Sequence, residues 1–155
     1  MKVLIDTNVI IDVLMKREPH ALHSAPFLKL CGAKVTGCLA ASQTTDIFYL
    51  LVRMGTDEQT AKTVIKKLTD NIKVLDVIAA DVQNGLASEM TDYEEALLAV
   101  CAKRVKADYI VTRNEKNFQL SPVTPISPED FEDVFVLAYG FNRLVNREKF
   151  VRRDR

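Results

Sequence analysis

The 155-residue sequence has no tryptophan, three cysteines and only five scattered glycines. The cysteines show no CxxC spacing, which disfavours a zinc site or a disulfide framework and favours buried thiols in a reducing compartment. Because no glycine follows the first apolar run, the phosphate-binding loops of Rossmann and P-loop proteins are excluded. No apolar run is long enough to cross a bilayer, so we expect a cytoplasmic protein without membrane contact.

The overall charge provides no whole-molecule attraction to nucleic acid, because 21 basic residues balance 21 acidic ones. The distribution is uneven, since residues 143–155 hold six basic and two acidic side chains, a surplus of +4. We interpret residues 137–155 as a basic C-terminal tail or helix extension that follows a domain over residues 1–136. A role of this segment in contacting RNA or a partner stays open.

Short apolar runs alternate with amphipathic patterns along the chain. The runs predict strands over Lys2–Ile5, Lys34–Leu39, Ile72–Val77, Tyr109–Thr112 and Val123–Ile126. The amphipathic patterns predict helices over Val9–Met15, Leu22–Leu30, Gln43–Met54, Glu58–Leu68 and Tyr93–Val105, a further helix after Ser127, and turns at Gly55–Asp57 and Asn84–Gly85. Strands separated by helices favour an α/β fold with a mostly parallel sheet covered on both faces.

Asp6 directly follows the first apolar run and precedes Thr7, Asn8 and a second apolar stretch. Open α/β sheets place their ligand chemistry at the carboxyl ends of the strands. Burial of a carboxylate beside a strand costs free energy unless the charge is compensated, and a bound cation is the usual compensation. We expect Asn8 to cap the following helix, which leaves Asp6 available for a site.

Further polar side chains stand at the ends of later elements. Asp46 lies at the edge of a buried helix face, where a solvent-facing acid or an ion pair is an equally good explanation. Asp92 and Glu95 form a capping-box pattern, so a structural role competes with a site role. Asn114 and Asn117 follow the fourth strand, where amide oxygens could ligate a hard cation or simply shape a turn.

Several carboxylates in one cleft raise one another's pKa, and a hard divalent cation relieves this repulsion. Ligands that are all oxygen favour Mg²⁺ or Mn²⁺ over zinc, and such ions assist phosphodiester hydrolysis. Phosphoaspartyl phosphatases and receiver domains also carry an acid after the first strand. We rank this class last, because the second aspartate of such a phosphatase would fall at position 8, which is asparagine.

Four segments, in the correct order, resemble the PIN-domain nuclease family: VLIDTNVIID (3–12), ASQTTDIFYLL (41–51), DYEEALLAVCA (92–102) and ADYIVTRNEKNF (107–118). The resemblance implies a three-layer α/β/α sandwich and an endoribonuclease that depends on Mg²⁺ or Mn²⁺. Many relatives are VapC-type toxins of toxin–antitoxin pairs and are often homodimeric. An RNA substrate, an antitoxin protein and a second subunit are therefore the partners that the resemblance implies.

The resemblance also assigns roles to individual residues. It makes Asp6, Asp46 and Glu95 the first three catalytic residues and places Asn114 in the fourth position. The metal ligands that it implies are Asp6, Asp46, Asp92 and Glu95, and the supporting residues are Thr7, Asn8, Thr112 and Asn117.

Two departures from the family pattern bear on activity. Glu95 stands where aspartate is usual, which moves the carboxylate by roughly 1.5 Å, and misplacement on this scale costs about 10²-fold in rate. Asn114 and Asn117 remove negative charge, so we expect one metal ion rather than two. The alternative function is therefore a catalytically weakened PIN-like module that binds RNA or a protein partner without turnover.

Overall fold

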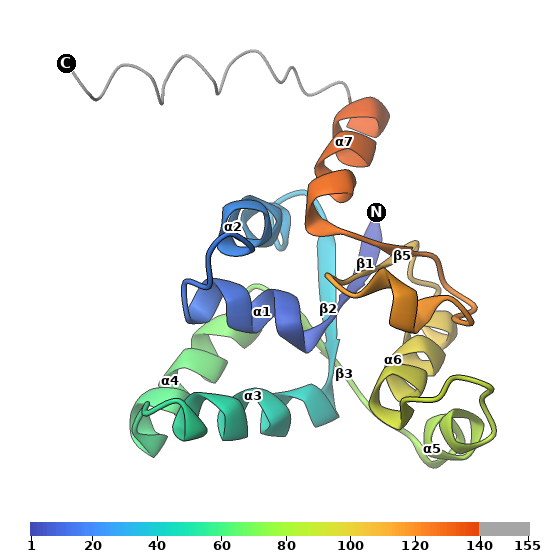
Figure 1. The fold of residues 1–155 in the computed structure, drawn as a ribbon, viewed down its shortest axis with the longest axis horizontal. Helices are drawn as coiled ribbons and strands as arrows, with labels where there is room; N and C mark the ends of the chain where they lie inside the picture. Colours follow the sequence, from blue (N-terminus) through green and yellow to red (C-terminus); the bar gives the residue numbers. More distant parts are fainter. Residues whose placement is uncertain (140–155) are drawn as a thin grey trace.

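A wholly parallel five-stranded sheet forms the centre of the computed structural model, which describes residues 1–139 (Figure 1). The strands are β1 (Lys2–Ile5), β2 (Thr36–Ala40), β3 (Lys73–Leu75), β4 (Tyr109–Val111) and β5 (Pro125–Ile126), in the spatial order β3-β2-β1-β4-β5. The chain runs outward from β1 to β3 and then returns to pair β4 with the other side of β1. Such a switch point opens a crevice at the carboxyl ends of the two neighbouring strands.

Helices cover both faces of this sheet (Figure 1). They are α1 (Thr7–Leu14), α2 (Ala21–Leu30), α3 (Ala41–Arg53), α4 (Glu58–Thr69), α5 (Ala79–Leu86), α6 (Tyr93–Arg104) and α7 (Pro128–Tyr139), with a short 3₁₀ helix η1 (Glu115–Phe118). Side chains of α1 to α4 and α7 pack in one apolar cluster, and side chains of α5, α6 and η1 pack in a second cluster on the opposite face. The three-layer α/β/α sandwich is therefore confirmed.

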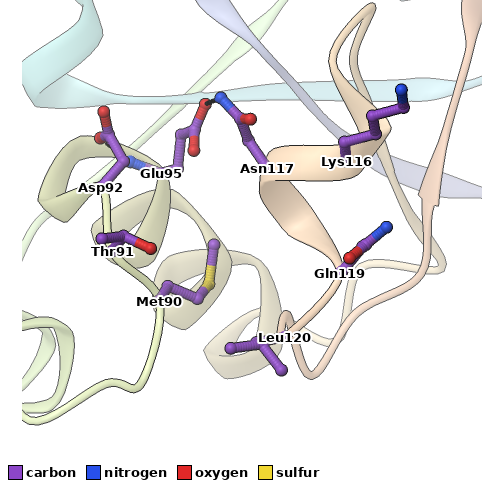
Figure 2. A pocket seen from close by; sticks show the side chains of 8 residues that line it. All are labelled: Met90, Thr91, Asp92, Glu95, Lys116, Asn117, Gln119 and Leu120. Atoms are coloured by element: carbon purple, nitrogen blue, oxygen red, sulfur yellow. Dashed lines mark hydrogen bonds between the residues drawn. The ribbon is translucent and has the colours of Figure 1, made fainter.

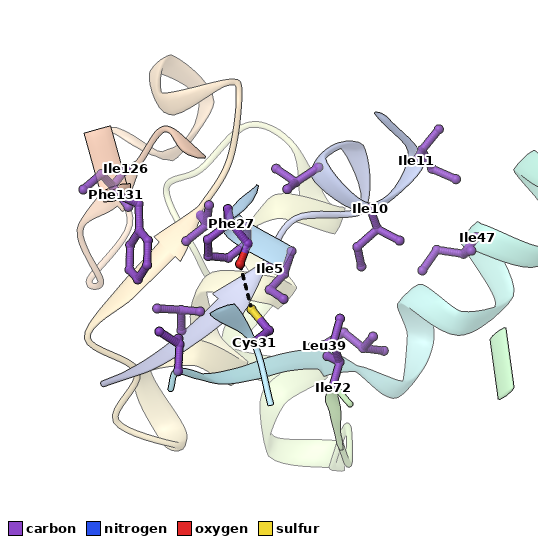
Figure 3. Close-up of a cluster of buried hydrophobic side chains, with 14 of the residues drawn as sticks. Ile5, Ile10, Ile11, Phe27, Cys31, Leu39, Ile47, Ile72, Ile126 and Phe131 are labelled. Carbon is purple, nitrogen blue, oxygen red and sulfur yellow. Dashed lines mark hydrogen bonds between the residues drawn. The ribbon is translucent and has the colours of Figure 1, made fainter. Parts of the chain in front are cut away.

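Alternation along β1 explains how one strand supports two cores. Val3 and Ile5 join the cluster with α1 to α4 and α7, whereas Leu4 joins the cluster with α6, as the two-residue period of a strand requires. Edge-to-face contact between Phe27 and Phe131, with ring centroids 5.1 Å apart, joins α2 to α7 (Figure 3). The three cysteines are free and buried.

The structure corrects the sequence prediction around α5. The sequence pattern predicts no helix over these residues, and the predicted turn at Asn84–Gly85 is wrong because both residues lie within α5. A Cβ atom at Gly85 would lie 3.4 Å from the Leu97 Cα and from the Tyr93 ring. Gly85 therefore lies in the contact between α5 and α6, where a methyl group would meet its neighbours at ordinary van der Waals distance.

The last helix begins where the sequence predicts. Ser127 Oγ accepts a hydrogen bond of 3.0 Å from the backbone N–H of Asp130, which is N-capping geometry. Because α7 extends to Tyr139, the predicted boundary after residue 136 falls inside this helix. The rest of the predicted basic tail, residues 140–155, lies outside the described residues. Among residues 1–139, none of the helices has the length and apolar character needed to span a membrane.

Candidate active site

Asp6 lies at the carboxyl end of β1, where the strand order of the sheet reverses. Its backbone is extended, and its Oδ1 accepts a long bond of 3.5 Å from the backbone N–H of Asn8, so Asp6 is the N-cap of α1. The prediction that Asn8 is the cap is wrong, because a single residue separates β1 from α1. Asp6 therefore combines a weak capping contact with a position at the switch point of the sheet.

The second oxygen of Asp6 is held from β4. Thr112, which follows this strand, donates a hydrogen bond of 2.7 Å to Asp6 Oδ2 and accepts one of 2.9 Å from the backbone N–H of Asn114. Only 5% of Asp6 is exposed. Burial raises the pKa of this carboxyl group, and the hydrogen bonds from Thr112 and Asn8 and the charge of Arg113 offset only part of that effect. The protein groups around Asp6 therefore only partly stabilise its ionised form, and a positively charged ligand could supply the rest.

Gln43 joins the carboxyl ends of two strands, a role that the sequence analysis did not predict. Its buried side-chain amide donates to the carbonyl of Ile5 (2.9 Å) and to Thr7 Oγ1 (3.1 Å), and its oxygen accepts from the backbone N–H of Ala40 (2.8 Å). These bonds fix the start of α3 against the end of β1. Asp46 follows one turn later on α3, on the same side of the helix.

Carboxylates from three elements share one electrostatic field at this edge. Burial raises the pKa of Glu94, and the charges of Asp46, Asp6, Asp92 and Glu95 raise it further. The pKa of Asp46 is also raised by burial. The charges of Asp6 and Asp46 therefore act on the first turn of α6. The structure adds Glu94, which sequence reasoning missed because acids in the first turn of a helix are common for electrostatic reasons alone.

The start of α6 faces η1 across a pocket of about 340 Å³ (Figure 2). Asp92 caps α6 by accepting a 3.1 Å bond from the backbone N–H of Glu95, as the sequence predicts. The Glu95 side chain does not complete a capping box, because its Oε1 accepts a 2.7 Å bond from the Asn117 side chain. The other lining residues are Met90, Thr91, Lys116, Gln119 and Leu120.

The remaining predicted residues are two asparagines that contribute backbone N–H groups and two threonines that contribute side-chain oxygens. Asn8 and Asn114 are exposed, and each contributes a backbone N–H, to Asp6 and to Thr112 respectively. Thr7 is buried and accepts the bond from Gln43. Thr112 likewise uses its side-chain hydroxyl, which donates directly to Asp6.

The oxygen donors suit a hard divalent cation, although they do not form a closed cage. No group of three His, Cys, Asp or Glu side chains within residues 1–139 is arranged to hold a metal ion. Glu95 Oε2, however, is buried without a hydrogen-bond partner in the same part of the chain. Mg²⁺ commonly uses one or two carboxylates and keeps several waters. The residues present therefore fit an open, hydrated site.

Comparison with known proteins agrees with this architecture. The PIN domain family model matches residues 2–116. The chain belongs to the PIN-domain family. Ribonuclease VapC1 of Aquifex aeolicus (strain VF5) is 24% identical to this PIN protein over 136 residues, which cover 84% of the present chain and 92% of the relative.

Solved structures show the same fold at low sequence identity. VapBC-1 from nontypeable Haemophilus influenzae matches with a TM-score of 0.63 and 17% identity, over 83% of this chain and 98% of the other. A toxin–antitoxin complex from Klebsiella pneumoniae matches with a TM-score of 0.62 and 16% identity, over 81% of this chain and 97% of the other. The three-layer fold of this chain is therefore shared with these solved structures.

Proposed function

We propose that this PIN protein is a metal-dependent endoribonuclease that hydrolyses RNA phosphodiester bonds and serves as the toxin of a toxin–antitoxin pair. The observation that carries the proposal is Asp6, which is buried at the end of β1 and fixed by Thr112, with other carboxylates in its electrostatic field. The name of the Aquifex relative, a ribonuclease, supports RNA as the substrate.

In this proposal, Asp6, Asp46 and Glu95 would hold the cation, with Asp92 and Glu94 as further carboxylates beside them. When bound, Mg²⁺ or Mn²⁺ supplies positive charge for the phosphate oxygens and makes a nearby water more acidic. Asn117 orients Glu95 through its 2.7 Å bond and leaves Oε2 available. Asn114 shapes the turn below Thr112 and offers an uncharged amide for orienting water.

The partners follow from the same comparison. One structural match is named a toxin–antitoxin complex and another is named VapBC-1, so we propose an antitoxin protein as the regulatory partner. The family resemblance adds the proposal of a homodimer as the active assembly, in the cytoplasm. Expression together with the product of the neighbouring gene, followed by size-exclusion chromatography with light scattering, tests both points. Elution of a lone monomer, with or without that product, contradicts them.

The second candidate is a PIN module that binds RNA or a protein without turnover. Two observations favour it: no three-acid metal cluster is present within residues 1–139, and amides occupy positions 114 and 117. It predicts RNA affinity that does not respond to divalent cations.

A cleavage assay separates the two candidates. Wild-type protein and Asp6→Asn are incubated with single-stranded and structured RNA in Mg²⁺, in Mn²⁺ and in chelator. We expect cleavage by the wild type only with a cation, and its loss in the Asp6→Asn variant. Cleavage that is equal in both proteins after repurification rejects the nuclease proposal, and binding without cleavage supports the second candidate.

A further inference from the structure

An ion pair beside the proposed catalytic residues has no role in the function described so far. Asp12 on α1 is fully buried, and its Oδ2 lies 2.7 Å from Arg113 Nε, although the two groups are not aligned as a hydrogen bond. Arg17 lies farther away, with Nη1 at 4.0 Å from Asp12 Oδ1. Burial raises the pKa of Asp12, and the charge of Arg113 is the largest effect that opposes it.

Arg113 belongs to the site by position. It directly follows Thr112, which holds Asp6, and its charge acts on the carboxyl group of Asp6. Its side chain is 27% exposed, so it reaches solvent from a buried anchor. Within residues 1–139, Asp12 is the only carboxylate within 4.0 Å of the guanidinium, and no hydrogen bond there uses its terminal nitrogens.

The charge of the surroundings makes such a cation useful. An RNA phosphate that approaches this edge meets the field of several carboxylates, which repel it. A guanidinium presents planar donors that match two phosphate oxygens and stays charged at any physiological pH. The Nε side of Arg113 lies against Asp12 in an ion pair, which leaves its terminal nitrogens for a ligand.

We propose that Arg113 binds the RNA phosphate next to the proposed metal ligands and that Asp12 is a positioning residue which holds the guanidinium there. The inference rests on the proposed ribonuclease function and extends it by naming the group that recognises the phosphodiester. Arg113 stabilises the charge of the phosphate oxygens during hydrolysis, and the buried pairing with Asp12 keeps the guanidinium preorganised.

A purely structural role is the competing explanation, in which Arg113 only neutralises a buried acid. Removal of one member of a buried pair leaves an uncompensated buried charge and is strongly destabilising, whereas removal of both members leaves no such charge. The two explanations therefore differ in the behaviour of the double variant Asp12→Asn/Arg113→Gln.

The experiment compares Arg113→Gln, Asp12→Asn, the double variant and Arg113→Lys with the wild type. Arg53→Gln, an exposed arginine at the end of α3, is the control for loss of one surface charge. Each protein is tested for its melting temperature, for the kcat and KM of RNA cleavage, and for the salt dependence of RNA affinity in chelator, where binding is read without turnover.

We expect Arg113→Gln to lower the melting temperature by on the order of 10 °C and kcat/KM by about 10²-fold. The double variant recovers most of the melting temperature, but its kcat/KM stays low. Its plot of log affinity against log salt is shallower than that of the wild type by about 0.7, the loss of one phosphate contact. Arg113→Lys keeps the wild-type slope and loses mainly kcat, and Arg53→Gln behaves as wild type.

Recovery of wild-type kcat/KM and salt slope in the double variant overturns the proposal, because Arg113 would then serve Asp12 alone. If the double variant stays unstable, the Arg113→Lys variant separates the two explanations. An unchanged salt slope with a lowered kcat supports the proposal, and an unchanged kcat overturns it. Absence of both cleavage and RNA binding in the wild type is a different result, which refutes the proposed function itself.

Discussion

Replacement of Thr112 by valine removes one hydroxyl group from the centre of the site and keeps the shape of the side chain. This hydroxyl donates the 2.7 Å bond to the buried Asp6 carboxylate and accepts the 2.9 Å bond from the Asn114 backbone. A hydrogen bond to a charged group contributes roughly 1.5–3 kcal/mol, and a backbone N–H left without an acceptor adds about 1 kcal/mol. We expect Thr112→Val to cost roughly 2–4 kcal/mol of unfolding free energy.

Thermal denaturation in chelator measures this cost without a contribution from metal. For a chain of about 150 residues, roughly 2–4 kcal/mol corresponds to a melting temperature lowered by about 5–15 °C. The matched control is Thr112→Ser, which keeps the hydroxyl and loses one buried methyl group, worth about 1 kcal/mol.

The dependence on pH has a definite sign. Burial raises the pKa of Asp6 and the Thr112 hydrogen bond lowers it, so loss of that bond raises the pKa further. Thr112→Val therefore has a lower free energy of unfolding than Thr112→Ser as long as Asp6 is ionised. This difference shrinks as the pH falls through the pKa of Asp6. Equal stability of the two variants at neutral pH refutes the reasoning, as does a deficit that grows in acid.

Three further changes test the surrounding structure. Gln43→Leu leaves three buried backbone and side-chain partners unpaired and should cost about 3 kcal/mol in urea denaturation; a cost below about 1 kcal/mol contradicts the joining role. Burial alone would raise the pKa of Asp81, but its hydrogen bonds and its ion pair with Arg104 lower it. The ionised Asp81 therefore stabilises the fold above pH 3.8, and this stabilisation is lost as the pH falls through the pKa of Asp81 in the folded state. Arg104→Met should therefore cost about 3 kcal/mol at neutral pH and less in acid, and a loss independent of pH argues against the pair. Glu94→Gln and Glu95→Gln should each weaken Mn²⁺ binding in calorimetry, and an unchanged affinity in Glu94→Gln removes that residue from the site.

Much of the fold was predictable because its signals are local. The apolar runs of β1, β2 and β4 and the stripe of α6 are visible in short windows, and the alternation of strands with helices indicates a parallel sheet. Helix α5 was not predictable in this way. It is eight residues long and contains Asn84 and Gly85, a pair that is typical of turns.

The site was predictable in part for the same reason. Asp6 follows a strand, so its place at the sheet edge follows from sequence order. The bonds from Thr112, 106 residues away, and from Gln43 to Ile5 depend on which strands become neighbours. Sequence spacing also could not separate Glu94 from a simple first-turn acid, because only the folded chain places it near Asp46.

The central claim is that the carboxylates around Asp6 hold a divalent cation. The most direct test is the melting temperature of wild type and Asp6→Asn during titration with Mn²⁺ in the absence of RNA. A cation at about 100 times its Kd stabilises the folded state by about 2.7 kcal/mol, which is roughly 5–10 °C for a chain of this size. The account predicts a saturating rise of this size for the wild type and none for Asp6→Asn; equal responses of the two proteins contradict it.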